Sequence, residues 1–147
     1  MLLVFDLDNT LSDAEHSSHL AREQKWDEFH SLCDQDEPRP HVVALLKDMA
    51  AQGNEIVVLT GRTSDHAGKT IAWLTRQGID ADAIYMRPVG DYRHDSEFKV
   101  LSMAQIVAAF QRPETTLDII VFEDRDNVVK SLRAAGYTVF QVRESLY

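Results

Sequence analysis

The sequence predicts an α/β fold in which helices cover a parallel β-sheet. Short apolar runs alternate with helical patterns along all 147 residues. Strands that alternate with helices of this length imply right-handed crossovers between parallel neighbours. Polar residues follow directly after several of the apolar runs. In an open α/β sheet, ligands bind at the edge formed by the carboxyl ends of the strands, so a site is expected on that edge.

Five strands are expected, and the first shows the pattern most clearly. Residues 2–5, Leu-Leu-Val-Phe, form a continuous apolar run, which is typical of a central parallel strand buried on both faces. The other expected strands are apolar runs at residues 56–59, 83–86, 117–122 and 137–142.

Helical patterns fill the intervals between these strands. Apolar residues with helical spacing at 42, 45, 46 and 49 indicate one helix, and further helices are expected at 67–77, 97–111 and 126–135. Glycine is typical just after a helix end, and Gly53, Gly78 and Gly136 occupy such positions. The helix at 97–111 is expected to turn the following residues toward the core: Val100, Ala104, Val107 and Phe110.

Length and composition indicate one domain, covering residues 1–147, with an ordinary core. Hydrophobic residues make up 44% and charged residues 27%, close to the average of globular proteins. The net charge of −9 opposes extended binding to nucleic acid, which requires that many phosphates be neutralised. A local basic pocket for one terminal phosphate remains compatible with this charge.

Cysteine usage and hydropathy indicate a cytoplasmic location. Cys33 is the single cysteine, which excludes an intramolecular disulfide and suits a reducing compartment. No apolar stretch approaches the roughly 20 residues of a membrane span, and no secretory signal is visible. We therefore expect no membrane partner.

Polar residues gather where the expected strands end. Asp6 and Asp8 follow the first strand, and alternation along the chain would point both side chains the same way. Two neighbouring carboxylates repel each other, so a bound cation is the expected remedy. Two further segments follow expected strands in the same way: Thr60, Gly61 and Arg62 after the second, and Glu123, Asp124 and Arg125 after the fourth. Lys99 lies near the start of the helix that precedes the fourth strand.

Phosphoryl transfer requires this set of residue types. Asp6 and Asp124 can hold Mg²⁺, which prefers a few carboxylates together with water and phosphate oxygens. Asp6 would attack phosphorus to give an aspartyl-phosphate, while Asp8 would protonate the leaving group and later deprotonate the hydrolytic water. The Thr60 hydroxyl and the Lys99 ammonium group would stabilise charge on the phosphoryl group.

Each motif alone has an ordinary structural explanation. Asp-x-Asp-x-Thr fits an Asx turn followed by a helix cap, and Thr-Gly-Arg is common in turns. A solvated helix position explains Lys99, and an acidic pair at a helix start explains Glu123 and Asp124. Their order along the chain, with three motifs at the ends of apolar strands, favours a catalytic site.

The motifs resemble those of the haloacid dehalogenase (HAD) superfamily of phosphatases over essentially the whole chain. The segments that carry the resemblance are Phe5–Leu11, Val58–Arg62, Lys99 and Glu123-Asp124. It implies a Rossmann-like doubly wound parallel five-stranded sheet in the order 5-4-1-2-3, with Asp6 as nucleophile and Asp8 as acid/base. It also implies Mg²⁺ bound by Asp6, the Asp8 backbone carbonyl and Asp124.

Two segments resemble more closely the 3′-phosphatase domain of phage-type polynucleotide kinase/phosphatase. They are residues 90–95, Gly-Asp-Tyr-Arg-His-Asp, and residues 123–142. The chain has no kinase P-loop, so 5′-kinase activity would belong to a separate partner, and Glu123 stands where aspartate is commoner. This resemblance implies that Arg93 and Arg125 engage the substrate. The expected substrate-binding residues are therefore Thr60, Gly61, Arg62, Arg93 and Arg125.

Residues 12–39, between the first motif and the next helix, fit a small helical cap insert with one helix. Such a cap is too small to enclose a metabolite, and a shallow roof suits a phosphate at the end of a large substrate. Trp26 and Phe29 could stack on a terminal base. Packing of these aromatic side chains onto the body of the domain is the commoner arrangement.

We therefore expect a Mg²⁺-dependent phosphomonoesterase that removes the 3′-phosphate from DNA or RNA ends, beside a separate kinase or ligase. Two alternatives stay open on the sequence. One is a HAD phosphatase that acts on nucleotides or other small phosphomonoesters, and the other is a non-catalytic phosphate-binding module. The second acid/base carboxylate, Asp8, argues against the module, because binding alone does not require it.

Overall fold

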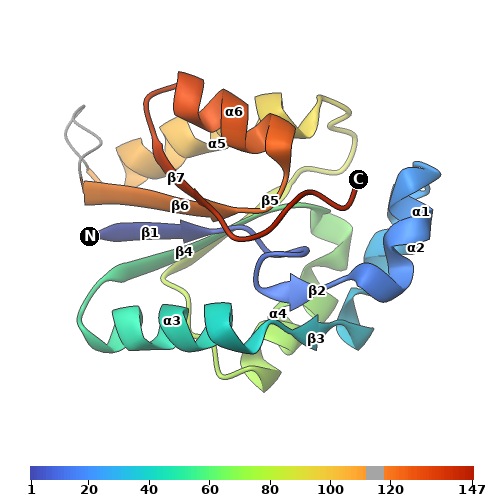
Figure 1. The fold of residues 1–147 in the computed structure, drawn as a ribbon, viewed down its shortest axis with the longest axis horizontal. Coiled ribbons are helices and arrows are strands. Elements are labelled where there is room, and N and C mark those ends of the chain that lie inside the picture. The colour runs from blue at the N-terminus through green and yellow to red at the C-terminus, as the bar shows by residue number, and fades with distance from the viewer. Residues whose placement is uncertain (112–117) are drawn as a thin grey trace.

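A parallel five-stranded sheet organises the chain (Figure 1). The structure is a computed structural model that describes residues 1–111 and 118–147. Its strands run in the order β5-β4-β1-β6-β7, and every neighbouring pair is parallel. They are β1 (Leu2–Phe5), β4 (Glu55–Thr63), β5 (Ala83–Arg87), β6 (Ile119–Glu123) and β7 (Thr138–Gln141).

The α/β class and the parallel five-stranded sheet are confirmed. The expected order, 5-4-1-2-3, counts only the strands of this sheet and corresponds to the observed order read from β7 to β5. The strand expected at 117–122 is β6, although its first residue, Leu117, lies outside the described residues. β4 is longer than the expected 56–59 and includes Thr60, Gly61 and Arg62.

Four helices cover the two faces of the sheet (Figure 1). On one face lie α3 (Pro40–Ala51) and α4 (Ala67–Arg76), and on the other α5 (Asp95–Ala109) and α6 (Asp126–Ala134). Successive residues of a strand point to opposite faces. In β1, Leu2 and Val4 therefore join the cluster under α5 and α6, while Leu3 and Phe5 join the cluster over α3 and α4.

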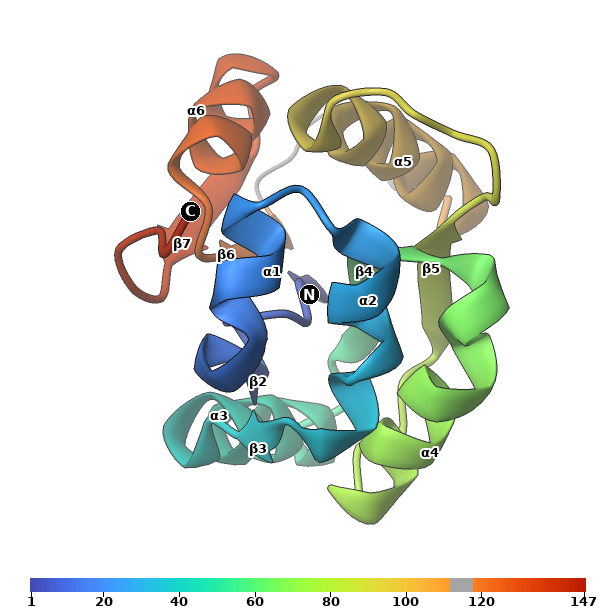
Figure 2. The same ribbon diagram turned by 90° about the vertical axis from the view of Figure 1, so that its right-hand side faces the viewer.

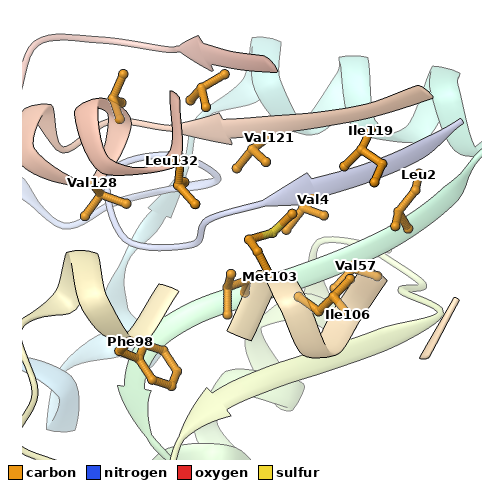
Figure 3. Packing of buried hydrophobic residues seen from close by; sticks show 13 residues of the cluster. Leu2, Val4, Val57, Phe98, Met103, Ile106, Ile119, Val121, Val128 and Leu132 are labelled. Atoms are coloured by element: carbon orange, nitrogen blue, oxygen red, sulfur yellow. The ribbon is translucent and has the colours of Figure 1, made fainter. Parts of the chain in front are cut away.

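The expected inward face of α5 is found in part. Val100, Val107 and Phe110 pack against the core as partly buried residues, whereas Ala104 is exposed. The fully buried apolar residues of the helix are Phe98, Met103 and Ile106. Figure 3 shows Met103 beside Val4 and Ile106 beside Val57. Lys99 lies on the same buried face of the helix, where its ammonium group pairs with the carboxylates of Asp6 and Glu123.

Residues 12–39, called the cap below, stand over the carboxyl edge of the sheet (Figure 2). The cap has two short α-helices where one was expected. β2 and β3 pair antiparallel at its base, and Arg39 adds an ion pair of 3.0 Å to Asp13. In chain order its elements are β2 (Ser12–Asp13), the 3₁₀ helix Glu15–Ser17, α1 (Ser18–Arg22), α2 (Trp26–Ser31), the 3₁₀ helix Cys33–Gln35 and β3 (Glu37–Pro38). A third 3₁₀ helix, outside the cap, spans Ser64–His66.

Within the described residues, none of the helices combines the length and apolar character needed to cross a bilayer.

Replacement of Ile106 by Ala should destabilise the fold by about 2–5 kcal/mol, the range for large-to-small changes in a packed core. Ile106 is fully buried, and the cavity left behind can only partly collapse. Ile71, on α4, is 50% exposed and provides the matched control, for which we expect a change of less than about 0.5 kcal/mol. Urea unfolding followed by circular dichroism measures both values. Equal losses in the two variants would contradict the assigned core.

Candidate active site

A tight turn after β1 brings two aspartates to the carboxyl edge of the sheet. The Leu7 carbonyl accepts hydrogen bonds from the amides of Thr10, Leu11 and Ser12, at 2.9–3.2 Å. Asp6 and Asp8, on either side of Leu7, both line one pocket at this edge. The predicted placement of the two carboxylates at a common site is therefore seen in the structure.

Lys99 joins Asp6 to the end of the neighbouring strand β6. Its Nζ lies 2.5 Å from Asp6 Oδ1 and 2.6 Å from Glu123 Oε2, and all three side chains are buried. Burial opposes the charge on Lys99, but the carboxylates of Asp6 and Glu123 outweigh it and hold the lysine pKa well above its ordinary value. The lysine therefore carries a positive charge at the floor of the pocket.

Asp124 completes a buried acidic cluster. One carboxylate oxygen from each of Asp6, Glu123 and Asp124 lies within 4.8 Å of the others. Both Asp124 oxygens are buried, and among the described residues neither has a hydrogen-bond partner. Burial, with the neighbouring carboxylates, raises the pKa of Asp124 to about 9 and that of Asp6 to about 8. One lysine does not balance three buried acids, so Asp6 and Asp124 keep their protons up to these pH values unless a further positive charge stabilises their ionised forms.

Glu123 has a second function at this edge. Its Oε1 accepts hydrogen bonds from the backbone amides of Asp124 (3.1 Å) and Arg125 (3.0 Å). Its Oε2 meets Lys99. The glutamate side chain is thus long enough to connect the lysine with the chain that leaves β6. This contact fixes the start of the segment that carries Asp124 and Arg125.

Arg62 lies behind Asp8 and not in the pocket. Its guanidinium is fully buried and bonds Asp8, with Nη2–Oδ1 at 2.7 Å, and Asp36, with Nη2–Oδ2 at 3.0 Å. Burial favours the neutral form of Asp8, but the Arg62 charge outweighs it and lowers the pKa of Asp8 below its ordinary value. Arg62 is fully buried and does not line the pocket, so the structure does not place it where the expected substrate contact requires.

Thr60 and Gly61 occupy the irregular end of β4. The register against β5 shifts between Thr60 and Thr63. Thr60 is buried, its hydroxyl accepts a hydrogen bond of 3.1 Å from the Arg62 amide, and it does not line the pocket. Gly61 does line it, and a Cβ atom there would lie 2.5 Å from Asp95 Oδ1. A side chain at this position would have to displace the Asp95 carboxylate, which is paired with Arg87.

Asp95 draws three cations to the pocket wall. Arg87 lies 2.9 Å from Asp95 Oδ1, while Arg125 and Lys99 lie 3.4 Å and 3.8 Å from Oδ2. Burial opposes ionisation of Asp95, but Lys99, Arg125 and Arg87 together lower its pKa below the ordinary value. Arg93 also lines the pocket, where it pairs with Asp91. Several donors suited to a phosphate thus meet on one wall.

The pocket has a volume of about 670 Å³, and its lining includes residues of the cap and of the loop that joins β5 to α5. The cap contributes Trp26, Phe29 and His30, and the loop contributes Val89 to His94. Tyr147 lines it as well, and its hydroxyl accepts a hydrogen bond of 3.0 Å from Asn9 Nδ2. Asp6, Asp8 and Lys99 therefore share this pocket with several aromatic side chains.

Several site residues were not predicted. Arg87 is the last residue of β5, so it could have been predicted in the same way as Asp6, as a polar residue at the end of a parallel strand. Asp95 lies one helical turn before Lys99 on α5, a spacing that makes two helical side chains neighbours. The sequence carried no comparable signal for Asp36, His30 or Tyr147, which reach the site through the folding of the cap and the C-terminal segment.

The acid stability of the protein should depend on His30. Burial lowers the pKa of this imidazole from 6.5 to about 4, so the unfolded chain binds a proton between these pH values while the folded chain does not. Stability supplied by neutral His30 is therefore lost as the pH falls from 6.5 to 4, by up to about 3 kcal/mol. The His30→Gln variant should show a shallower fall when the free energy of unfolding is measured against pH without metal. His41→Gln, an exposed control, should follow the wild type, and identical curves for all three would contradict the assignment.

Comparison with known proteins identifies the family. Over residues 1–147 the chain matches the family model HAD_PNKP, the polynucleotide kinase PNKP phosphatase domain. No curated protein matches it significantly. Two structures of a Pnkp1/Rnl/Hen1 complex, one described as an RNA repair complex, contain chains with 26% identity and a TM-score of 0.78. The alignment covers 99% of this chain but only 43% and 47% of theirs, so this chain spans less than half of their length.

More distant structures share the fold. A hydrolase from Streptococcus pneumoniae TIGR4 is 16% identical with a TM-score of 0.67, over 97% of this chain and 92% of the hydrolase. The class C acid phosphatase from Bacillus anthracis with tungstate bound is 16% identical with a TM-score of 0.64, over 99% and 67% of the two chains. The expected resemblance is confirmed: the chain belongs to the PNKP phosphatase domain family of the HAD hydrolases.

Proposed function

We propose that the protein is a Mg²⁺-dependent phosphomonoesterase that removes the 3′-phosphate from DNA or RNA ends. The observation that carries the proposal is the match of the entire chain to the PNKP phosphatase domain. Two observations in the structure support it: Asp6 and Asp8 line one pocket, and Asp124 lies beside Asp6 in a buried acidic cluster. The proposed nucleophile, Asp6, and the proposed acid/base, Asp8, are both present at this pocket, so a binding module without turnover is disfavoured.

The donor set at the pocket floor fits Mg²⁺. Mg²⁺ is a hard cation that takes carboxylate oxygens, and Asp124, whose oxygens have no hydrogen-bond partner among the described residues, places one of them within 4.8 Å of an Asp6 oxygen. Asp6 and Asp124 would hold the ion, with the Asp8 backbone carbonyl that the family resemblance implies. When bound, Mg²⁺ supplies positive charge between the nucleophile and the phosphate dianion.

Asp6 would form the covalent intermediate. An Asp6 oxygen attacks phosphorus, the bond from phosphorus to the leaving oxygen breaks, and an aspartyl-phosphate results. Lys99, 2.5 Å from Asp6 Oδ1, holds the carboxylate in place and balances charge as the phosphoryl group arrives. Water then attacks the aspartyl-phosphate and regenerates Asp6.

Asp8 would transfer protons in both steps. It gives a proton to the leaving 3′-oxygen and then accepts one from the attacking water. Arg62 favours the ionised form, which is the form needed for the second step. Arg62 therefore acts through Asp8 as a positioning residue. The proposed phosphate contacts are Gly61, Arg93 and Arg125, and the buried Thr60 supports the end of β4 next to Gly61.

Partners and location remain proposals. The Pnkp1 chains belong to complexes with Rnl and Hen1, and they are more than twice as long as this chain's matching region. We therefore propose that a kinase or a ligase, on another segment or another chain, acts on the same nucleic-acid ends as this phosphatase. The location expected from the single buried cysteine, Cys33, is the cytoplasm.

Phosphate release from a 3′-phosphorylated oligonucleotide tests the reaction and the substrate. We expect release that depends on Mg²⁺, with little release from the matching 5′-phosphorylated strand or from the 3′-mononucleotide. Asp6→Asn should lower the rate on the order of 10³-fold or more, because the nucleophile is lost. Asp80→Asn, at an exposed acid, is the control and should keep wild-type activity. A higher kcat/KM on the mononucleotide would favour a small-molecule phosphatase, and no release at all would favour a binding module.

Mg²⁺ should raise the melting temperature of the protein by several degrees. Binding to the folded state alone contributes about 2.7 kcal/mol when the ion is present at 100 times its Kd. Asp124→Asn should abolish the shift and should also raise the melting temperature in EDTA, because it removes one buried repelling carboxylate. Asp80→Asn should keep the wild-type shift, and a full shift in Asp124→Asn would refute the site.

A further inference from the structure

We propose that Trp26 is a stacking platform for the base of the nucleotide whose 3′-phosphate reacts, with Tyr92 as a second aromatic contact. The inference rests on the proposed function, because it takes the phosphate beside Asp6 to belong to a nucleotide. It adds that the pocket binds one phosphate and one base and does not contact a longer stretch of the sugar-phosphate backbone.

Both aromatic residues lie in the pocket that contains the nucleophile. Trp26 begins α2 in the cap, and Tyr92 lies in the loop between β5 and α5. Both line the pocket together with Asp6 and Lys99. Figure 2 shows α2 and this loop as separate borders of the carboxyl edge. A nucleotide whose phosphate lies beside Asp6 would therefore have aromatic side chains from two elements within the same cavity.

Exposed apolar surface gathers at this pocket. Among the described residues, Trp26 is 38% exposed, Val89 66% and Tyr92 95%, and all three line it. Large apolar side chains that remain in water in a concave site mark a surface that gains free energy when a ligand covers it. The Trp26 and Tyr92 rings offer flat faces, which suit a flat ligand.

Trp26 is held in place by contacts that leave part of its ring open. Phe29 meets it at 6.1 Å and Tyr147 at 6.0 Å between ring centroids, both edge to face. The guanidinium carbon of Arg125 lies 5.8 Å from the Trp26 ring, and Arg125 also contacts Asp95 beside Lys99. One arginine thus connects the phosphate side of the pocket to the aromatic side. A platform fixed in this way loses little conformational entropy when a base stacks on it.

The charges near Trp26 favour a base over a second phosphate. Asp27 and Asp65 line the pocket on the cap side, and both are exposed acids. They would repel an additional phosphate, whereas a neutral base carries no net charge for them to oppose. Stacking on an aromatic side chain also tolerates any base, because every base has a π-face. The site would therefore act on ends of any sequence.

Kinetics with matched substrates test the platform. The pair consists of a 3′-phosphorylated oligonucleotide and the same strand with an abasic terminal nucleotide. Trp26→Ala should raise KM about tenfold for the base-containing strand and leave the abasic strand unchanged, the size and selectivity expected of one lost stack. Phe140→Ala, an exposed aromatic residue outside the pocket, should change neither. Equal losses on both substrates would overturn the proposal.

Tryptophan fluorescence gives a direct reading of contact. The chain has two tryptophans, and Trp73 is fully buried, so a ligand in the pocket can quench only Trp26. With turnover prevented by Asp6→Asn, the base-containing strand should quench the emission and the abasic strand should not. Trp26→Phe should remove the quenching while keeping an aromatic ring in the cap. Equal quenching by both strands, or none by either, would contradict stacking.

The outcome also separates this inference from the proposed function. If the wild type fails to release phosphate from oligonucleotide 3′ ends, the proposed function is wrong. The stacking comparison then uses a nucleoside monophosphate and the matching sugar phosphate, which differ only in the base. If the wild type releases 3′-phosphate but Trp26→Ala does not distinguish base from abasic ends, only the inference is wrong.

Discussion

An excess of buried negative charge governs the carboxyl edge of this sheet. Buried charges are costly unless they are paired, and Lys99 is shared between Asp6 and Glu123. The alignment of β1 with β6 makes the sharing possible, because the Asp6 amide donates to the Phe122 carbonyl at 2.9 Å. The sheet therefore brings together more buried acids than Lys99 alone can pair, and the Mg²⁺ proposed above would complete this group.

The effect of that charge extends beyond the acids. α5 presents Lys99 to the cluster, and Asp95 on the same helix then gathers Arg87 and Arg125. Gly61 lets the end of β4 approach Asp95 closely enough for these contacts to share one wall. Alternating acids and bases thus continue from the sheet edge into the pocket. The chain can be strongly acidic overall and still present arginines where a phosphate would bind.

The sequence was most informative for residues whose position at the end of a strand is enough to bring them together. Asp6 and Asp124 follow buried parallel strands, so their meeting at one edge follows from the topology. Arg62 has the same kind of position, but its direction depends on a partner, Asp36, that reaches it through the fold of the cap. The buried face of α5 also includes Lys99, a position that apolar periodicity alone does not identify. The local sequence pattern thus predicts which residues lie at the carboxyl edge of the sheet. Which of several carboxylates pairs with a given arginine or lysine is decided only in the folded chain.

The base of the cap has a consequence for how such a domain can diversify. β2 and β3 join the two ends of the cap as a short ladder, and Ser12 donates to Asp36 across it at 3.1 Å. Everything between these ends is a closed loop, and doubling the length of such a loop costs only about 0.6 kcal/mol in closure entropy. Segments of other lengths could therefore be exchanged above the ladder while Asp8 keeps its geometry. Substrate range would then change by recombination of a module, separately from the chemistry beneath it.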